Sequence, residues 1–265
     1  MLLAIDSGNT NVKFGVYDGD NLRASWRLRT EVGRTSDQYS ALLRTLFADA
    51  ELSFSDVDGV IVASSVPAAT PDILRLARRN FDAEPIHVTP HTDLGIDIAY
   101  QPPTDVGADR LVDVVAAIGQ YGAPCVVVDF GTATTFNAIV GPREPGGRPI
   151  YLGGAICPGI GLSLDALYAR AAKLSSVELL SPTCAIGNNT ARALQAGVIY
   201  GYAAQVDGLV TRILAEIGET PCPVIATGGH ATEIIIRETR TIAHVESELT
   251  LRGLRLVYDR LQNRS

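Results

Sequence analysis

The sequence predicts an α/β protein made of two related domains. Short apolar strands alternate with amphipathic helices along the chain, which is the pattern of layered α/β folds. A strand that ends in Asp-x-Gly, followed by a turn and a second strand, occurs at Asp6 and again 123 residues later at Asp129. A repeat of nearly half the 265-residue chain indicates duplication of one domain. We therefore expect one domain over residues 1–122 and a second over residues 123–265.

Composition and charge narrow the class of protein. Hydrophobic residues make up 46% of the chain and charged residues 19%, as in ordinary globular proteins. The 22 basic and 29 acidic residues give a net charge of −7, whereas proteins that bind nucleic acid through its phosphates are usually basic. We therefore expect no nucleic-acid partner. Only two of the basic residues, Lys13 and Lys173, are lysines.

The sequence also predicts a compartment. The segment Met1–Asp6 has no positively charged region and only a short apolar run, so it does not resemble a signal peptide. No apolar run approaches the roughly 20 residues that a membrane helix needs. The four cysteines show no CxxC spacing, and we expect free thiols. These features predict a cytoplasmic protein with no membrane partner.

In the first half of the chain, an apolar strand leads through a polar turn to two further strands, and helices and strands then alternate. The predicted strands are Leu2–Ile5, Val12–Tyr17, Leu22–Leu28, Gly59–Ala63 and Pro85–Val88. The predicted helices are Asp37–Ala48, Pro71–Phe81 and Gly107–Tyr121.

The second half begins with the same pattern and then becomes mostly helical. The predicted strands are Cys125–Val128, Thr135–Val140 and Val224–Ala226. The predicted helices are Leu162–Lys173, Asn189–Ile217 and Glu248–Leu261. Gly141–Pro149 is rich in Gly and Pro and reads as a hairpin loop.

The two Asp-x-Gly turns have the residues of a nucleotide clamp. Gly8 and Gly131 let the backbone approach a ligand closely, and main-chain N–H groups with the polar side chains at 9–11 can donate to phosphate oxygens. A carboxylate repels phosphate, so Asp6 and Asp129 fit there as holders of a cation or its waters. Each Asp alone is explained as well by an Asx-turn. The pair favours the clamp.

A third turn, Thr227-Gly228-Gly229-His230, directly follows a predicted strand. Its two glycines could allow close approach of a flat ligand such as a base or ribose. A tight loop that caps the next helix explains them as well. His230 is more readily explained as structural, or as a neighbour of the nucleotide, than as a base.

Five motifs in order resemble those of type III pantothenate kinases, within the superfamily of acetate and sugar kinases, heat-shock chaperones and actin. They are DxGNTxxK at Asp6–Lys13, GxDR at Gly107–Arg110, DxGTAxT at Asp129–Thr135, GGxIxPG at Gly153–Gly159, and Asn189-Thr190 before the glycine-containing stretch Gly197–Gly201. Thr227–Gly229 resembles the adenosine motif of the superfamily. The resemblance spans residues 1 to about 260.

The resemblance implies two ribonuclease-H-like (actin-like ATPase) domains with a nucleotide cleft between them. It implies ATP-dependent phosphorylation of pantothenate to 4'-phosphopantothenate, the first step of coenzyme A biosynthesis, by a homodimer. The implied ATP-binding residues are Asp6, Ser7, Gly8, Asn9, Thr10, Asn11, Val12, Lys13 and Thr132. Asp6 would hold Mg²⁺, directly or through water, and Asp129 would hold a monovalent cation, K⁺ or NH₄⁺.

On the substrate side, the resemblance implies that Asp109 is the general base. The implied pantothenate-binding residues are Tyr100, Gly107, Ala108, Asp109, Arg110 and Thr190. The chemistry agrees, because a carboxylate is ionised at neutral pH and can accept the proton of an alcohol. An Asp at a helix start is also favoured by the helix dipole. Arg110 could hold an anion or be a solvated surface arginine, and Thr132 and Thr190 could be helix or turn caps.

Three functions are compatible with these motifs. The first is phosphorylation of pantothenate, and the second is another small-molecule kinase of the same superfamily. The third is a nucleotide-binding regulatory protein that has kept the clamp but not the chemistry. Asp109, beside two complete turns, favours a kinase over the regulator.

Overall fold

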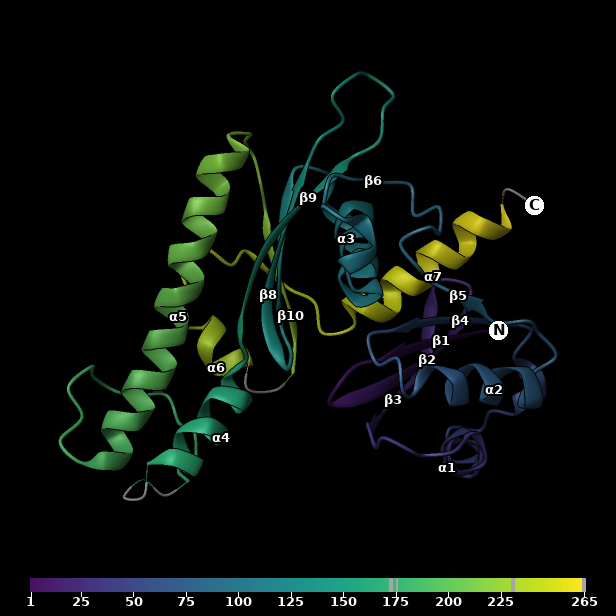
Figure 1. Ribbon diagram of the computed structural model, residues 1–265, viewed down its shortest axis with the longest axis horizontal. Helices are drawn as coiled ribbons and strands as arrows, with labels where there is room; N and C mark the ends of the chain where they lie inside the picture. Colours follow the sequence, from purple (N-terminus) through teal and green to yellow (C-terminus); the bar gives the residue numbers. More distant parts are fainter. Residues whose placement is uncertain (172–173, 175, 230–231, 264–265) are drawn as a thin grey trace. The chain divides into compact units, whose positions relative to one another are not determined.

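The computed structural model describes residues 1–171, 174, 176–229 and 232–263, and the chain divides into two compact units (Figure 1). Unit 1 comprises Met1–Ile96, Tyr100–Gly119 and Glu248–Ser265, and unit 2 comprises Asp97–Ala99 and Gln120–Ser247. The predicted boundary at residue 122 leaves the C-terminal helix in the second half. In the structure that helix belongs to unit 1, because it packs on the first sheet.

Unit 1 is built on a five-stranded sheet in the order β3-β2-β1-β4-β5. Its strands are β1 (Leu2–Ser7), β2 (Asn11–Asp18), β3 (Asn21–Arg29), β4 (Gly59–Ser64) and β5 (Ile86–His87). The first three strands are antiparallel, and β4 and β5 run parallel to β1. The strand order places the turn between β1 and β2 near the centre of the sheet.

Helices pack on both faces of this sheet. The core on one face joins the odd-numbered side chains of β1 to α1 (Ser36–Asp49) and α2 (Thr70–Asn80) through buried residues such as Leu43 and Ile73. The other face contacts α7 (Leu249–Gln262), and α3 (Ala108–Tyr121) packs on α7. Two 3₁₀ turns, Phe54–Asp56 and Pro103–Asp105, complete the unit.

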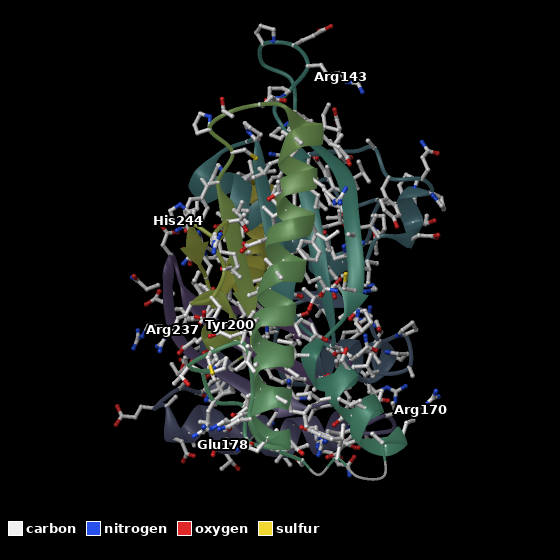
Figure 2. All side chains as sticks on the ribbon, turned by 90° about the vertical axis from the view of Figure 1, so that its left-hand side faces the viewer. Arg143, Arg170, Glu178, Tyr200, Arg237 and His244 are labelled. Carbon is white, nitrogen blue, oxygen red and sulfur yellow. The ribbon has the colours of Figure 1, made fainter. Side chains whose placement is uncertain are left out.

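Unit 2 is built on a six-stranded sheet in the order β11-β10-β7-β8-β9-β6. Its strands are β6 (Asp97–Ile98), β7 (Cys125–Phe130), β8 (Ala133–Val140), β9 (Ile150–Pro158), β10 (Val224–Gly228) and β11 (His244–Val245). Its helices are α4 (Ile160–Arg170), α5 (Thr190–Ile217) and α6 (Thr232–Ile236). Arg143 lies in the loop that joins β8 to β9, as expected for the predicted hairpin (Figure 2).

The two sheets repeat one topology. Strands β7, β8 and β9 are antiparallel, and β10 and β11 run parallel to β7, as β4 and β5 do to β1. The order β5-β4-β1-β2-β3 in unit 1 therefore recurs as β11-β10-β7-β8-β9 in unit 2. This confirms the predicted duplication and the α/β fold class.

Strand β9 is the main element that the sequence did not predict. Gly153 and Gly154 lie inside it, and glycine is rare in strands. Gly154 has φ +156°, and a Cβ there would collide with the carbonyl oxygen of Phe136 on β8. The glycines therefore let β9 pack closely against β8 at a bulge. The same glycines weaken the strand pattern in the sequence, so the strand was not predicted.

The remaining differences are short elements and ends of helices. Strands β6 and β11 have two residues each and α6 has five, too few to leave a periodic signal. The described helix α4 ends at Arg170. Lys173 and His230 lie outside the described residues.

The four cysteines are free thiols, as predicted. Burial raises the pKa of the Cys125 thiol to about 12, so at neutral pH it is protonated and unreactive.

Close packing between α7 and α3 gives a test of unit 1. A Cβ at Gly253 would collide with the backbone carbonyl of Val112. Gly253→Ala should lower the free energy of unfolding in urea by about 1–3 kcal/mol, the usual cost of overpacking. Gly161→Ala is the matched control, because a Cβ there meets nothing within 4 Å. Equal stability of the two variants would contradict the packing of α7 on α3.

Candidate active site

The turn between β1 and β2 is closed by its own backbone. The N–H of Gly8 donates to the carbonyl of Asn11 at 3.0 Å. Thr30, which follows β3, fastens the turn twice: its hydroxyl donates to the Gly8 carbonyl at 2.6 Å and its N–H to the Thr10 carbonyl at 2.9 Å. Thr30 carries no signal of this role in the sequence, because only the pairing of three strands brings it to the turn.

Asp6 and Lys13 lie opposite each other on β1 and β2, so their side chains share one face of the sheet. The Nζ of Lys13 is 3.9 Å from Oδ2 of Asp6, and the two side chains are only 19% and 9% exposed. A buried carboxylate is costly unless it is compensated, and Lys13 supplies an opposite charge. The predicted phosphate motif thus contains a carboxylate and an ammonium side by side.

The other predicted ATP-binding residues differ in accessibility. Asn9 and Thr10 are exposed at the tip of the turn, and Gly8 and Asn11 are half-buried. The side chains of Ser7 and Val12 are fully buried, and Val12 belongs to the hydrophobic core. If these two residues contact a nucleotide, they do so through the main chain. The six residues are Ser7, Gly8, Asn9, Thr10, Asn11 and Val12.

The GxDR segment forms the start of α3. Asp109 is in the first turn, half-buried, and its Oδ1 accepts a hydrogen bond from the N–H of Arg110 at 2.8 Å. A Cβ at Gly107 would collide with the Asp109 carboxylate, so a larger residue there would displace that side chain from its position at the helix start. Ala108 is buried.

Arg110 and Tyr100 come together in unit 1. The Arg110 guanidinium lies 5.9 Å from the centre of the Tyr100 ring, within the range of a cation–π contact. Arg110 is 8% exposed, so the alternative of a solvated surface arginine is wrong. A buried guanidinium held against a ring has a fixed position from which it can meet an anion.

The turn between β7 and β8 repeats the construction of the first. The N–H of Gly131 donates to the carbonyl of Ala133 at 3.0 Å, and the N–H of Gly159 donates to the carbonyl of Thr132 at 3.1 Å. Gly159 follows β9 as Thr30 follows β3. A Cβ at Gly159 would collide with the carbonyls of Gly131 and Thr132, which explains the last glycine of the GGxIxPG motif.

The strand-end aspartate and the third turn lie beside this second turn. Asp129 is half-buried and pairs in register with Thr227 of β10, and Thr132 is exposed. Gly228 has φ +126°, and a Cβ there would collide with the Phe130 carbonyl. The first glycine of the TGG sequence is therefore explained by packing of β10 on the end of β7.

Thr190 is the first residue of α5 and is exposed. The preceding Asn189 caps the helix, because its side chain accepts a hydrogen bond from the N–H of Arg192 at 2.9 Å. The capping role that was open for Thr190 thus falls to Asn189. The Thr190 hydroxyl lies at a helix start without being the N-cap.

The arrangement of acidic side chains limits which metal sites are possible. Among the described residues, no three His, Cys, Asp or Glu side chains gather closely enough to hold a metal ion. A divalent cation beside Asp6 would thus need most of its ligands from phosphate and water, which is the usual coordination of Mg²⁺ in kinases. The buried carboxylate of Asp6 fits that coordination. No helix in the described part of the chain is long and apolar enough to span a membrane.

Solved structures with this fold include sugar kinases. The ROK hexokinase from Thermus thermophilus matches 98% of this chain and 99% of its own, with a TM-score of 0.50.

 The identity over that match is 14%, so the likeness concerns the fold alone. The ethanolamine utilization protein EutJ from Carboxydothermus hydrogenoformans matches 96% of this chain and 89% of its own, at 15% identity and a TM-score of 0.54. The two sheets with their paired turns form the two-domain actin-like ATPase fold, which these solved structures share.

Sequence comparisons identify the family within that class. The family model described as type III pantothenate kinase matches residues 2–212. A type III pantothenate kinase of Exiguobacterium is 48% identical over 262 residues, covering 99% of this chain and all of the relative. One of Roseiflexus is 48% identical over 265 residues, covering both chains completely. The chain belongs to the type III pantothenate kinase family.

Proposed function

We propose that this protein transfers the γ-phosphoryl group of ATP to the primary hydroxyl of pantothenate, giving 4'-phosphopantothenate and ADP. One observation carries the proposal. In both units of this chain, which belongs to the family, an aspartate near the end of a strand leads into a turn that is closed by the N–H of its own glycine. In the reaction, the hydroxyl oxygen bonds to the γ-phosphorus as the bond to the β,γ-bridging oxygen breaks. This is the opening step of coenzyme A synthesis.

The candidate residues of unit 1 have three different roles in the proposed reaction. Main-chain N–H groups at the exposed tip of the turn, Asn9 and Thr10, and the Lys13 ammonium bind phosphate oxygens, which stabilises the negative charge that develops on ADP. Asp109 takes the proton of the hydroxyl, because its carboxylate has one oxygen turned to the helix start and a second available. Arg110, fixed against Tyr100, binds the substrate carboxylate or the transferring phosphoryl group.

Cations complete the proposed chemistry. Mg²⁺ neutralises phosphate charge when it is bound, and Asp6 would hold it directly or through water. A monovalent cation, K⁺ or NH₄⁺, would be held by Asp129. In unit 2, Thr132 would contact ATP and Thr190 the substrate. The cytoplasmic location predicted from the sequence stays a prediction.

The product assay tests the reaction. Purified protein with ATP, Mg²⁺, K⁺ and pantothenate should form phosphopantothenate. Failure of a folded, ATP-binding protein to form it would favour a nucleotide-binding regulator. Phosphorylation of a different alcohol under the same conditions would favour another small-molecule kinase.

Replacement of the proposed base sharpens that assay. Asp109→Asn should lower kcat by about 10²- to 10⁴-fold, because general base catalysis is lost, while the Kd for ATP changes little. The control is Asp105→Asn, an exposed carboxylate four residues earlier, which should leave both quantities unchanged. Equal loss of turnover and ATP affinity in Asp109→Asn would show that Asp109 is structural.

We also propose a homodimer that forms through α5. Figure 2 looks onto this helix, whose outward face carries small exposed residues at intervals of three or four. They are Ala193, Gly197, Gly201, Ala204 and Gly208. A Cβ added at any of the three glycines meets nothing within 4 Å. Each glycine costs an exposed helix up to about 1 kcal/mol relative to alanine, so close approach of a second backbone explains them better than the isolated helix does.

A bulky charge on that face should prevent association. Gly201→Glu is expected to give a monomer in light scattering at a concentration where the natural sequence is dimeric. Thr45→Glu adds the same carboxylate to an exposed position of another helix, α1, and should stay dimeric. A natural chain that is monomeric, or a dimeric Gly201→Glu, would contradict the proposal.

A further inference from the structure

Strand β3 extends the Asp6–Lys13 pair by one more residue. Lys13 pairs in register with Arg27, so Asp6, Lys13 and Arg27 form one row across three neighbouring strands. Residues directly opposite each other on antiparallel strands point to the same face of the sheet. The row therefore presents one carboxylate and two cations, with strands spaced about 4.8 Å apart.

A β-bulge creates this row. The register between β2 and β3 shifts between Val16 and Tyr17, which leaves Arg23 as the extra residue. Without the shift, counting from the Asp18–Asn21 turn would place Trp26 opposite Lys13. The bulge instead turns Trp26 toward the hydrophobic core and Arg27 toward Lys13.

Arg27 has no direct anionic partner among the described residues. Within the described part of the chain, the Arg27 guanidinium is exposed and makes no hydrogen bond or ion pair. Arg23, near the other end of β3, is paired with Asp18 at 3.4 Å. Charges of like sign directly opposite each other destabilise a pair of strands, and a bound anion would relieve the repulsion between Lys13 and Arg27.

The equivalent row of unit 2 has a different character. There Asp129 pairs with Thr135, and Thr135 pairs with Ile156, which is 61% exposed. The duplicated framework thus keeps the carboxylate in both units and places two cations in unit 1 only. Protection of an edge strand by charge explains an exposed arginine on β3, but it does not explain a second cation beside Lys13.

We propose that Arg27 binds the polyphosphate chain of ATP together with Lys13. This inference rests on the proposed function, because it takes the turn at Asp6–Lys13 to be the phosphate site. A guanidinium offers several N–H donors in one plane and suits phosphate oxygens. Arg27 is a binding and positioning residue and takes no part in proton transfer.

Nucleotide binding by matched variants tests the assignment. Arg27→Gln should raise the Kd for ATP at least about tenfold, the effect of losing one charge-assisted hydrogen bond, and should weaken competition by inorganic tripolyphosphate equally. The Kd for adenosine should not change, because adenosine has no phosphate. Arg27→Lys, which keeps the charge, should recover part of the loss, and Arg23→Gln on the same strand should bind all three ligands normally.

Two results would overturn the inference. One is an Arg27→Gln protein with the ATP affinity of Arg23→Gln, and the other is an equal loss of adenosine and ATP affinity, which would indicate a local structural effect. Thermal melting of each variant checks the fold, and Arg27→Lys gives the comparison if Arg27→Gln is unstable. A natural chain that binds ATP but does not phosphorylate pantothenate would overturn the proposed function and leave the role of Arg27 standing.

Discussion

The pairing of Asp6 with Lys13 is the interaction on which the candidate site depends. It places a carboxylate at the end of a buried central strand, where it needs compensation, and supplies that compensation from the neighbouring strand. The short turn between the two strands then exposes its backbone and the polar tip residues Asn9 and Thr10. A carboxylate, an ammonium and an exposed turn are therefore concentrated in eight consecutive residues, Asp6–Lys13, on one hairpin.

Duplication gave this protein two copies of the hairpin and allowed them to diverge. Both turns are closed by the N–H of their own glycine and fastened by the residue that follows the third strand. The side chains on the framework differ: Lys13 and Arg27 follow Asp6 in its row, whereas Thr135 and Ile156 follow Asp129. Under the proposed function, the shared backbone gives each unit a turn for the nucleotide, and the different rows favour polyphosphate binding in unit 1.

Local patterns in the sequence were sufficient for much of the fold. Apolar runs and the hairpin turns predicted the strands that became β1, β2, β3, β7 and β8, and helical spacing predicted α1, α2, α3, α5 and α7. Strand β9 was missed because the glycines that let it pack on β8 weaken the strand signal. The placement of α7 in unit 1 depends on contacts with strands more than 180 residues away in the chain, which no local pattern encodes.

The candidate site divides in the same way. Sequence motifs identified the turns and the start of α3. The hydrogen bonds that Thr30 and Gly159 donate to the turns depend on the pairing of three strands. The position of Arg27 depends on a bulge that shifts register by one residue, so simple counting along β2 and β3 gives the wrong partner. Burial of Arg110 against Tyr100 likewise appears only in three dimensions.

The most direct test of the account is the affinity of Lys13 variants for ATP. If Lys13 compensates Asp6 and binds phosphate, Lys13→Ala should raise the Kd for ATP by about tenfold or more in calorimetry, and Lys13→Arg should retain most of the affinity. An unchanged Kd for ATP in a folded Lys13→Ala protein would remove Lys13 from the site and contradict the assignment of the first turn to phosphate.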